Sequence, residues 1–452
     1  MGICKCFRTT RGKFRYVLAT LALLLMQAAL LPSYSQSRPT GVDIDRGHEM
    51  LRQIKDDLKK NYYDPTYHGM DVEARFKAAD EKIKQAASLS QIFGIIAQVL
   101  LDLDDSHTFF LPPQRSARAE YGWQAQVIGD KAYVVAVRPG SDAEAKGLRP
   151  GDEIVSVDGV HLSRKNLWIF GYLYYALRPQ PAMQLAVVKP DGKQEQIDVL
   201  TKIEEGRRRL DLTGRGAGAD FHTLVLESEA DRRLHRHRWV ESGEELFVWK
   251  MPDFDLSKQG VDDMVSKFRK RKMLILDLRG NGGGYVDALT QLLGYFFDHD
   301  VKVGDPKGRK ETKPVIAKSQ GNDIFPGKLI VLIDSGSASA AELFARVVQL
   351  EKRGTVIGDN SAGSVMRSIQ YERKLGLDTI ILWGVSITNA DLRMSDGKSL
   401  EHVGVVPDET RLPTAADLAA KCDPVLAYAV SLMGGNLSPE KAGALFPIEW
   451  KK

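Results

Sequence analysis

Short apolar runs that alternate with helical patterns in the second half of the chain restrict its fold more than any other feature of the sequence. Between and after these runs, apolar residues recur at helical spacing over 260–270, 284–298 and 340–352. Alternation of this kind is typical of a layered α/β domain in which helices cover a central sheet. We therefore predict such a domain over residues 244–435. Its expected strands are Leu246–Trp249, Met273–Leu276, Lys328–Ile333 and Thr355–Gly358.

Other patterns flank this domain, as expected for a chain of 452 residues, which exceeds what one hydrophobic core usually organises. Apolar residues repeat at helical spacing in three stretches of residues 41–113, which predicts three short packed helices. Residues 114–205 instead favour strands and turns, and residues 206–243 have the composition of a charged connector. The last residues, 436–452, are expected to form a tail.

The N-terminus has the pattern of a secretory signal. Basic residues precede the uncharged apolar run Tyr16–Leu31, and Ser33-Tyr34-Ser35 places small residues at the two positions that a signal peptidase reads. We therefore predict a signal peptide over residues 1–35 and an exported protein, periplasmic or secreted, that meets a membrane only through this segment. The alternative is a retained anchor, because the apolar run is close to the shortest that spans a bilayer.

Charge and cysteine content exclude several classes of function. The formal net charge is only +4, and part of it lies in the predicted signal, which argues against a nucleic-acid-binding face. Cys4 and Cys6 also lie in that signal, so Cys422 is left without a partner for an internal disulfide. No metal-ligand spacing surrounds Cys422, and the basic neighbours of His235 and His237 would repel a metal ion. We expect no metal and no organic cofactor.

A glycine-rich turn, Asp277–Gly284, lies between a predicted strand and a predicted helix. Glycines at such a turn leave backbone N–H groups free and allow a substrate to approach closely. A phosphate-binding loop is the competing interpretation. The turn has neither the Gly-Lys-Ser/Thr ending nor the Gly-x-Gly-x-x-Gly spacing of nucleotide-binding loops, which disfavours a nucleotide ligand.

Two more segments carry side chains that are able to react. The first, Asp334–Phe344, follows a strand and opens a helix, so a serine there presents its hydroxyl at the positive end of the helix. The alternative is a serine N-cap with Glu342 as the acid of a capping box. The second segment is the loop Asp105–Phe110, which contains Ser106 and His107. Most lone histidines are structural, and neither segment indicates chemistry by itself.

Residues 114–205 resemble a PDZ domain. The resemblance rests on the pattern Leu148-x-x-Gly151-Asp152-x-Ile154 and on the turn Val157-Asp158-Gly159. A PDZ fold binds an extended peptide as an added strand and holds the terminal carboxylate in a backbone nest. The loop at this position departs from the usual Gly-Leu-Gly-Phe type. The residues that the resemblance assigns to peptide binding are Tyr121, Gly122, Trp123, Gln124 and Ala125.

Taken in order, the segments over residues 41–432 resemble the C-terminal processing (tail-specific) and tricorn proteases. The resemblance rests on the helices, the Ser-His-Thr loop, the PDZ insert, the Asp-Leu-Arg-Gly-Asn-Gly-Gly turn, the Ser-Ala-Ser-Ala-Ala-Glu helix start and Gly404–Asp408. It implies an α/β serine peptidase with a ClpP/crotonase-like core, preceded by the helical region and the inserted PDZ-like domain. It also implies unstructured polypeptides or protein C-terminal tails as substrates. It does not specify how many copies of the chain assemble.

The resemblance assigns roles to individual residues. Ser339 corresponds to the nucleophile, and the oxyanion hole would come from backbone N–H groups of Gly282 or Gly283 and of Ala340. Many relatives use a lysine as the base, but this chain has Ser364 at that position. A serine hydroxyl cannot act as a general base near neutral pH.

The tricorn-type branch instead uses a histidine from the Ser-His loop and a glutamate just before the Gly-x-x-Pro-Asp element. His107 and Glu401 fill these positions. We assign His107 as the base, with Glu401 and Ser106 as its supporting groups and His402 as the alternative base. The main alternative function is a catalytically inactive relative that only binds peptides, since the lysine is missing. Binding or hydrolysis of a small apolar ligand on this scaffold also stays open.

Overall fold

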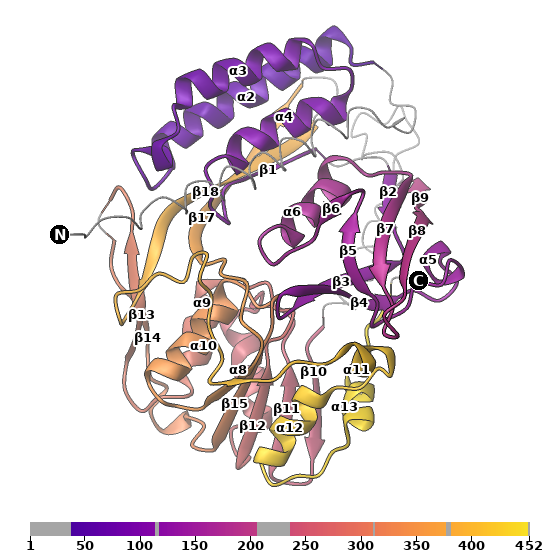
Figure 1. The fold of residues 1–452 in the computed structure, drawn as a ribbon. Helices are drawn as coiled ribbons and strands as arrows, with labels where there is room; N and C mark the ends of the chain where they lie inside the picture. The colour runs from indigo at the N-terminus through magenta and orange to yellow at the C-terminus, as the bar shows by residue number, and fades with distance from the viewer. Residues whose placement is uncertain (1–37, 114–116, 206–235, 311, 377–380, 451–452) are drawn as a thin grey trace, which may run out of the picture.

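The computed structural model describes residues 38–113, 117–205, 236–310, 312–376 and 381–450 (Figure 1). Its central sheet has the strand order β10-β11-β12-β15-β16-β19. Strand β10 lies antiparallel to β11, and all other neighbours in this sheet are parallel. The predicted α/β architecture is therefore confirmed. The strands are β10 (Arg238–Ser242), β11 (Leu246–Lys250), β12 (Met273–Asp277), β15 (Lys328–Ile333), β16 (Thr355–Gly358) and β19 (Glu409–Thr410).

Helices cover both faces of this sheet, which explains why its inner strands are apolar along their whole length. Successive residues of β12 point to opposite faces. Leu276 packs in the core beneath α8, α9 and α10, whereas Ile275 packs in the core beneath α12 and α13. The helices are α8 (Lys258–Phe268), α9 (Val286–Gly294), α10 (Ala340–Leu350), α12 (Pro424–Leu432) and α13 (Pro439–Leu445).

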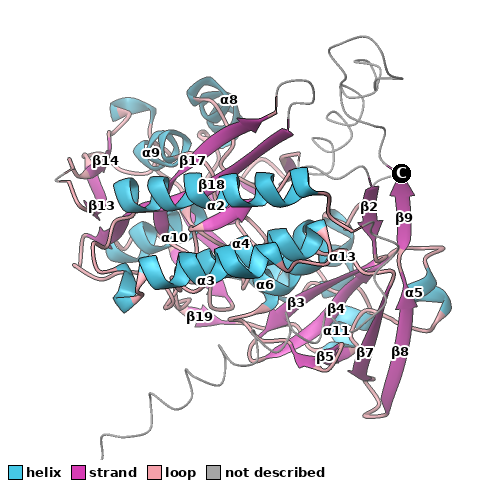
Figure 2. Cartoon of the chain, turned by 90° about the horizontal axis from the view of Figure 1, so that it is seen from above, coloured by secondary structure: helices cyan, strands magenta, loops and turns pink. Residues whose placement is uncertain are grey.

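A second, antiparallel sheet combines one strand from the first third of the chain with strands from its last third. Its order is β1-β18-β13-β14, and β17 also pairs with β18. Helices α2, α3 and α4, which the sequence predicts, lie above it (Figure 1, Figure 2). Phe110 of β1 lies opposite Val385 of β18 and packs against Phe93 and Trp383. Strands from the last third of the chain thus complete the core of the helical region. The elements are α2 (Gly41–Asn61), α3 (Val72–Lys84), α4 (Leu89–Leu101), β1 (Phe109–Leu111), β13 (Val301–Lys307), β14 (Val315–Ala317), β17 (Met366–Leu375) and β18 (Ile381–Met394).

The PDZ-like segment forms a separate sheet, in which β3 is an edge strand of the order β3-β4-β5-β7-β8 and β6 pairs with β5. Leu148, Ile154 and Val157 of the sequence pattern lie in its core. The hydroxyl of Ser335 in the α/β domain donates a hydrogen bond to the carbonyl oxygen of Val127 on β3 (2.5 Å). The elements are β2 (Ala117–Glu120), which pairs with β9 (Lys202–Glu205), and β3 (Trp123–Ile128), β4 (Lys131–Val137), α5 (Asp142–Ala145), β5 (Glu153–Val157), β6 (Val160–His161), α6 (Leu167–Gly171), β7 (Ala182–Val188) and β8 (Gln194–Leu200).

The structure differs from the sequence prediction at the edges of these units. Strand β10 lies inside the predicted connector, 206–243, and pairs along its whole length with β11. Helix α13 lies inside the predicted tail, and Leu445 packs against the core under α12. Cys422, in the turn between α11 (Ala415–Ala419) and α12, is partly exposed. The predicted signal peptide falls outside the described residues, within which no helix has the length and apolarity needed to cross a bilayer.

We predict that Phe110→Ala destabilises the chain by about 3–5 kcal/mol, because it removes a fully buried ring from the joint between β1 and the helices. Urea denaturation followed by tryptophan fluorescence measures the loss. Leu382→Ala, at a position of β18 that is 62% exposed, is the control and should change the free energy of unfolding by less than about 1 kcal/mol. Equal effects of the two variants would contradict the prediction.

Candidate active site

Ser339 occupies the turn between β15 and α10 in a backbone conformation that residues other than glycine rarely adopt. Its φ and ψ angles are 54° and −117°. Strain of this kind persists only where surrounding contacts hold it. Here the Ser339 N–H donates to the carbonyl oxygen of Ser364 (2.9 Å) and to Glu342 Oε2 (3.0 Å). The turn places Ser339 directly before α10, where the helix dipole stabilises negative charge.

The glycine-rich turn lies directly against this serine. A Cβ atom on Gly283 would be 2.6 Å from the Cβ atom of Ser339, so no side chain fits there. Contrary to expectation, the Gly283 N–H is not a free donor, because it donates to Asn281 Oδ1 (2.8 Å). The N–H groups of Gly282 and Ala340 have no acceptor among the described residues. These two groups are therefore the available donors beside Ser339.

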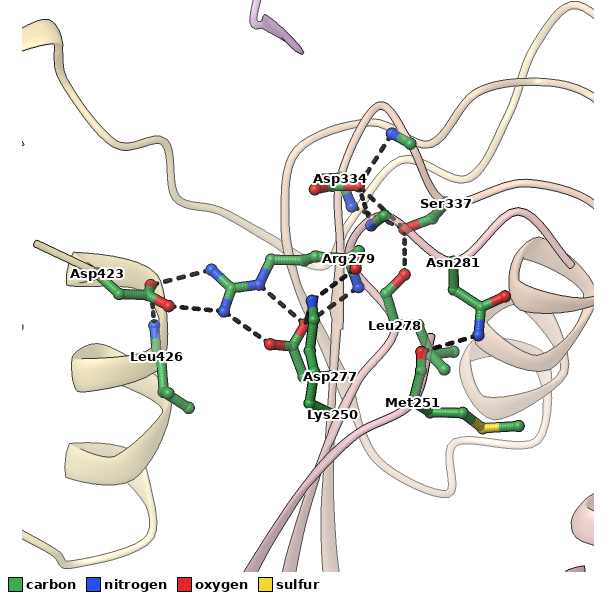
Figure 3. Close-up of polar contacts among 12 residues, drawn as sticks. Lys250, Met251, Asp277, Leu278, Arg279, Asn281, Asp334, Ser337, Asp423 and Leu426 are labelled. Carbon is green, nitrogen blue, oxygen red and sulfur yellow. Dashed lines mark hydrogen bonds and ion pairs between the residues drawn. The ribbon is translucent and has the colours of Figure 1, made fainter. Parts of the chain in front are cut away.

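A network of buried charges holds the start of the glycine turn (Figure 3). The Arg279 guanidinium donates to both oxygens of Asp277 and to both oxygens of Asp423, the residue that precedes α12, at 2.7–2.9 Å. Lys250 Nζ also donates to Asp277, at 3.2 Å. Although burial acts against ionisation, the charges of Arg279 and Lys250 lower the pKa of Asp277. The position of the turn thus depends on a carboxylate supplied by the C-terminal helices.

The other serines near Ser339 have structural partners (Figure 3). The Ser337 hydroxyl is fully buried and donates to the carbonyl oxygen of Leu278 (2.8 Å). The carboxylate of Asp334 accepts the N–H of Gly280 at 2.8 Å, which ties the serine turn to the glycine turn. The Ser335 hydroxyl is bonded to β3, so both neighbouring serines of this turn have partners of their own.

The structure brings together three residues that the sequence analysis assigned to one group. The Ser106 hydroxyl donates to Glu401 Oε2 (2.9 Å) and lies 2.7 Å from His107 Nδ1. The Ser106 N–H donates to Glu401 Oε1 at 2.8 Å. Burial raises the pKa of Glu401, and the N–H donors of Val365 and Ser106 oppose this effect. The histidine loop and Glu401 thus form one hydrogen-bonded unit.

A buried aspartate anchors the histidine loop on the second sheet. Asp105 Oδ1 accepts the N–H groups of His107 (3.0 Å) and Thr108 (2.8 Å) and the hydroxyl of Thr388 on β18 (2.6 Å). Burial lowers the pKa of the His107 imidazole, and the negative charge of Asp105 partly opposes this shift. The imidazole is therefore neutral at pH 7, as a general base must be.

One segment, Gly363–Val365, connects the histidine unit with the serine turn. The Val365 N–H donates to Glu401 Oε2 (2.8 Å), while the Ser364 carbonyl oxygen accepts the N–H of Ser339. No hydrogen bond joins the Ser339 hydroxyl to His107 within the parts of the chain that the structure describes. The two groups are linked through this segment.

Glu342 is the residue of the site that sequence reasoning missed, since its capping-box position accounts for it without a tertiary contact. Its fully buried carboxylate accepts hydrogen bonds from the Ser361 hydroxyl and from the N–H groups of Ser339, Gly363 and Ser364, at 2.5–3.0 Å. Burial raises the pKa of Glu342 to about 7, although these donors oppose the shift. On α10, Glu342 shares one face with Arg346 and Gln349, so helical periodicity gave no signal of its burial.

The alternative base is poorly placed. The His402 side chain is 56% exposed, and its Nε2 lies 2.9 Å from the carbonyl oxygen of Asp104. Because a carbonyl oxygen only accepts hydrogen bonds, this nitrogen carries the proton and cannot receive another. His402 therefore serves to tie its loop to the histidine loop.

In the predicted peptide-binding loop, both aromatic side chains are buried. Tyr121 and Trp123 lie in the core of the PDZ-like sheet, and the Tyr121 hydroxyl donates to the carbonyl oxygen of Tyr174 (3.1 Å). Gly122, with φ 73°, makes the turn into β3, whose Gln124 and Ala125 are not buried. A peptide would therefore meet the backbone of this loop.

No group of three or more His, Cys, Asp or Glu side chains suited to a metal occurs in the described ranges.

Comparison with known proteins finds two matching family models. The family model described as Peptidase family S41 matches residues 248–411, and the PDZ domain model matches residues 133–167. Residues 248–411 thus resemble peptidase family S41. The matched region begins on β11 and includes the glycine turn, Ser339 and Glu401, so the chain is a serine peptidase that carries a PDZ domain.

Curated relatives match most of the length of this chain. The chloroplastic C-terminal processing peptidase of Tetradesmus obliquus is 26% identical over 78% of this chain and 74% of its own length. The carboxyl-terminal-processing protease of Synechocystis sp. is 21% identical over 92% and 93%. The tail-specific protease of Haemophilus influenzae is 25% identical over 67% of this chain and 43% of its own length.

Solved structures share the fold of this chain. Mature CPAF superposes with a TM-score of 0.62 at 15% identity, covering 84% of this chain and 95% of that structure. The photosystem II D1 C-terminal processing protease gives 0.51 at 18% identity, covering 87% and 99%.

We predict that Glu342→Gln changes how stability depends on pH. With a pKa of about 7 in the folded chain and an ordinary value of 4.5, Glu342 binds its proton more tightly when folded. The stability that protonated Glu342 contributes is fully present below pH 4.5 and is lost as pH rises through 7. The loss is about 3 kcal/mol, since one pKa unit corresponds to about 1.36 kcal/mol. The amide of the glutamine that replaces it does not ionise. The free energy of unfolding of the variant should therefore rise relative to that of the wild type between pH 4.5 and 8.

Guanidinium denaturation at pH 4.5, 6 and 8 measures this difference. Glu351→Gln, at the exposed end of the same helix, is the control for the loss of a carboxylate from α10. Stability profiles of wild type and Glu342→Gln that run parallel from pH 4.5 to 8 would contradict the prediction.

Proposed function

We propose that this peptidase hydrolyses peptide bonds with Ser339 as the nucleophile and His107 as the general base, which Glu401 and Ser106 orient. The observation that carries the proposal is the chain of hydrogen bonds from Glu401 through Ser106 to His107 Nδ1. This arrangement stands in place of the lysine base of other relatives, whose position Ser364 occupies. An imidazole held in this way has one nitrogen left to receive the proton of the nucleophile.

The protons of this chain determine which nitrogen of His107 is basic. The Glu401 carboxylate only accepts hydrogen bonds, and it accepts the proton of the Ser106 hydroxyl. Ser106 has no second proton to give, so its oxygen accepts the proton on His107 Nδ1. The other nitrogen, Nε2, then carries a lone pair. It can take a proton from a serine hydroxyl.

In the proposed reaction, the Ser339 oxygen attacks the peptide carbonyl carbon while His107 Nε2 takes its proton. The carbonyl oxygen becomes negatively charged and is received by the N–H groups of Gly282 and Ala340 at the positive end of α10. His107 then gives the proton to the leaving amine, and a water molecule releases the acyl group from Ser339. The hydrogen bond from Ser339 to His107 forms on substrate binding, because such bonds tighten in the enzyme–substrate complex.

We further propose that the substrates are unstructured polypeptides or C-terminal tails of exported or envelope proteins. The names of the curated relatives, which refer to C-terminal processing and tail specificity, support this substrate class. The edge strand β3 supports it too, since a PDZ edge takes up an extended peptide by strand addition. Because Ser335 contacts Val127 on β3, a tail lying along this strand is led toward Ser339.

The remaining expectations belong to the same proposal. The signal peptide over 1–35 and the periplasmic or secreted location agree with a peptidase that acts on exported chains. The ClpP/crotonase-like core and the domain layout that the sequence predicts are proposed with it.

We predict that Ser339→Ala and His107→Ala each lower kcat for an unstructured peptide by about 10⁴-fold or more, since the two act as one unit. The double variant should be hardly slower than either single one. His299→Ala, which removes an exposed imidazole, is the control and should keep wild-type rates. A fluorophosphonate probe should label wild type but not Ser339→Ala. Full cleavage by His107→Ala would remove His107 from the mechanism, and the absence of any cleavage would favour peptide binding alone.

We predict that the acidic limb of the kcat/KM profile has its midpoint below pH 6.5, the ordinary imidazole value. Burial lowers the pKa of His107, so the base stays unprotonated to a lower pH than an exposed histidine. Initial rates between pH 4.5 and 8 give the midpoint. His402→Ala should leave the midpoint unchanged, and loss of cleavage in that variant would contradict the assignment of His107 as the base.

A further inference from the structure

An open cleft of about 490 Å³ lies beside the glycine turn. Its walls are the segment Asp255–Lys258 and the segment Tyr285–Asp287 at the start of α9. Backbone hydrogen bonds join the two walls, from the Phe254 N–H to the Gly283 carbonyl oxygen (2.7 Å) and from the Tyr285 N–H to the Phe254 carbonyl oxygen (3.2 Å). The base of the cleft is therefore continuous with the turn that lies against Ser339.

The cleft is close enough to the nucleophile to receive part of the same substrate. A Cβ atom on Gly283 would touch the Cβ atom of Ser339 at 2.6 Å, and one on Gly284 would lie 2.7 Å from Asp255 Oδ1. These two glycines are consecutive in the chain. Ser339 therefore lies beside Gly283, and Asp255 lies beside the next residue of the turn, Gly284. An extended polypeptide advances about 3.3 Å per residue, and its side chains next to the scissile bond come within reach of the cleft.

The lining of the cleft combines apolar surface with uncompensated negative charge. Tyr285 and Val286 are 65% and 41% exposed, although both are large and apolar. Asp255 and Asp287 form no ion pair with any described residue, and Lys258 is the one cation among the lining side chains. Burial, and then the charge of Asp253, raise the pKa of Asp255. A positive charge placed beside Asp255 would favour its ionised form.

We propose that this cleft binds the side chain of an arginine or lysine that lies next to the scissile bond of the substrate, an inference that rests on the proposed function. The aliphatic part of such a side chain covers Val286, and its charged end lies between the Tyr285 ring and the Asp255 carboxylate. A glutamate would meet two like charges, of which Lys258 offsets only one. A short apolar side chain leaves Asp255 unpaired.

The test uses three peptides that differ at one residue adjacent to a fixed cleavage point and carry arginine, norleucine or glutamate there. The kcat/KM value for arginine should exceed that for norleucine by about fivefold, and glutamate should be the poorest, since an exposed charge pair is worth up to about 1 kcal/mol. Asp255→Asn should bring the ratio of arginine to norleucine close to one. Asp263→Asn, an exposed carboxylate of α8 outside the cleft, should leave the ratio at its wild-type value.

A binding measurement separates this inference from the proposed function. Fluorescent forms of the same peptides are titrated with Ser339→Ala and with Ser339→Ala/Asp255→Asn. Tighter binding of the arginine peptide that is lost in the second variant supports the cleft, whether or not wild type cleaves. Cleavage without a preference for arginine, or a ratio that Asp255→Asn does not change, overturns the inference and leaves the peptidase proposal standing. Absence of Ser339-dependent cleavage overturns the peptidase proposal instead.

Discussion

The geometry of the site depends on one buried carboxylate. Glu342 receives hydrogen bonds both from the strained turn at Ser339 and from the segment Ser361–Ser364. A buried carboxylate is costly unless its donors are in place, so the two segments are held to one mutual arrangement. This explains how Ser339 keeps a positive φ angle. It also fixes Val365, which binds Glu401, and so sets the histidine unit relative to the nucleophile.

The site also requires that the first and last thirds of the chain share a sheet. Strand β1 continues from the loop that carries His107, and it pairs with β18. Asp105 then bonds to Thr388 on the same strand, which fixes the height of the imidazole above the sheet. Packing of Phe110 against Trp383 therefore helps to hold the loop that carries His107. Ser339, in contrast, belongs wholly to the central sheet and its helices.

Sequence reasoning could predict the central sheet because strands covered on both faces are continuous apolar runs that stand out locally. Grouping His107 with Glu401 required the family resemblance, since no local pattern connects residues almost 300 positions apart. Neither local sequence patterns nor the family resemblance could predict three features of the structure. The capping-box spacing hid the tertiary contacts of Glu342, the Asn281 side chain takes the Gly283 N–H, and the Tyr121 ring turns inward at a loop where sequence alternation does not specify direction.

Asp423 both begins helix α12 and neutralises Arg279, and this double role bears on the biosynthesis of the enzyme. The glycine turn precedes Asp423 by more than 130 residues, so it emerges from the ribosome long before its counter-charge. Until then Arg279 has one carboxylate fewer to offset the cost of its burial. A nascent chain therefore completes the turn beside Ser339 only after Asp423 has been made, which delays proteolytic capacity until that point of synthesis.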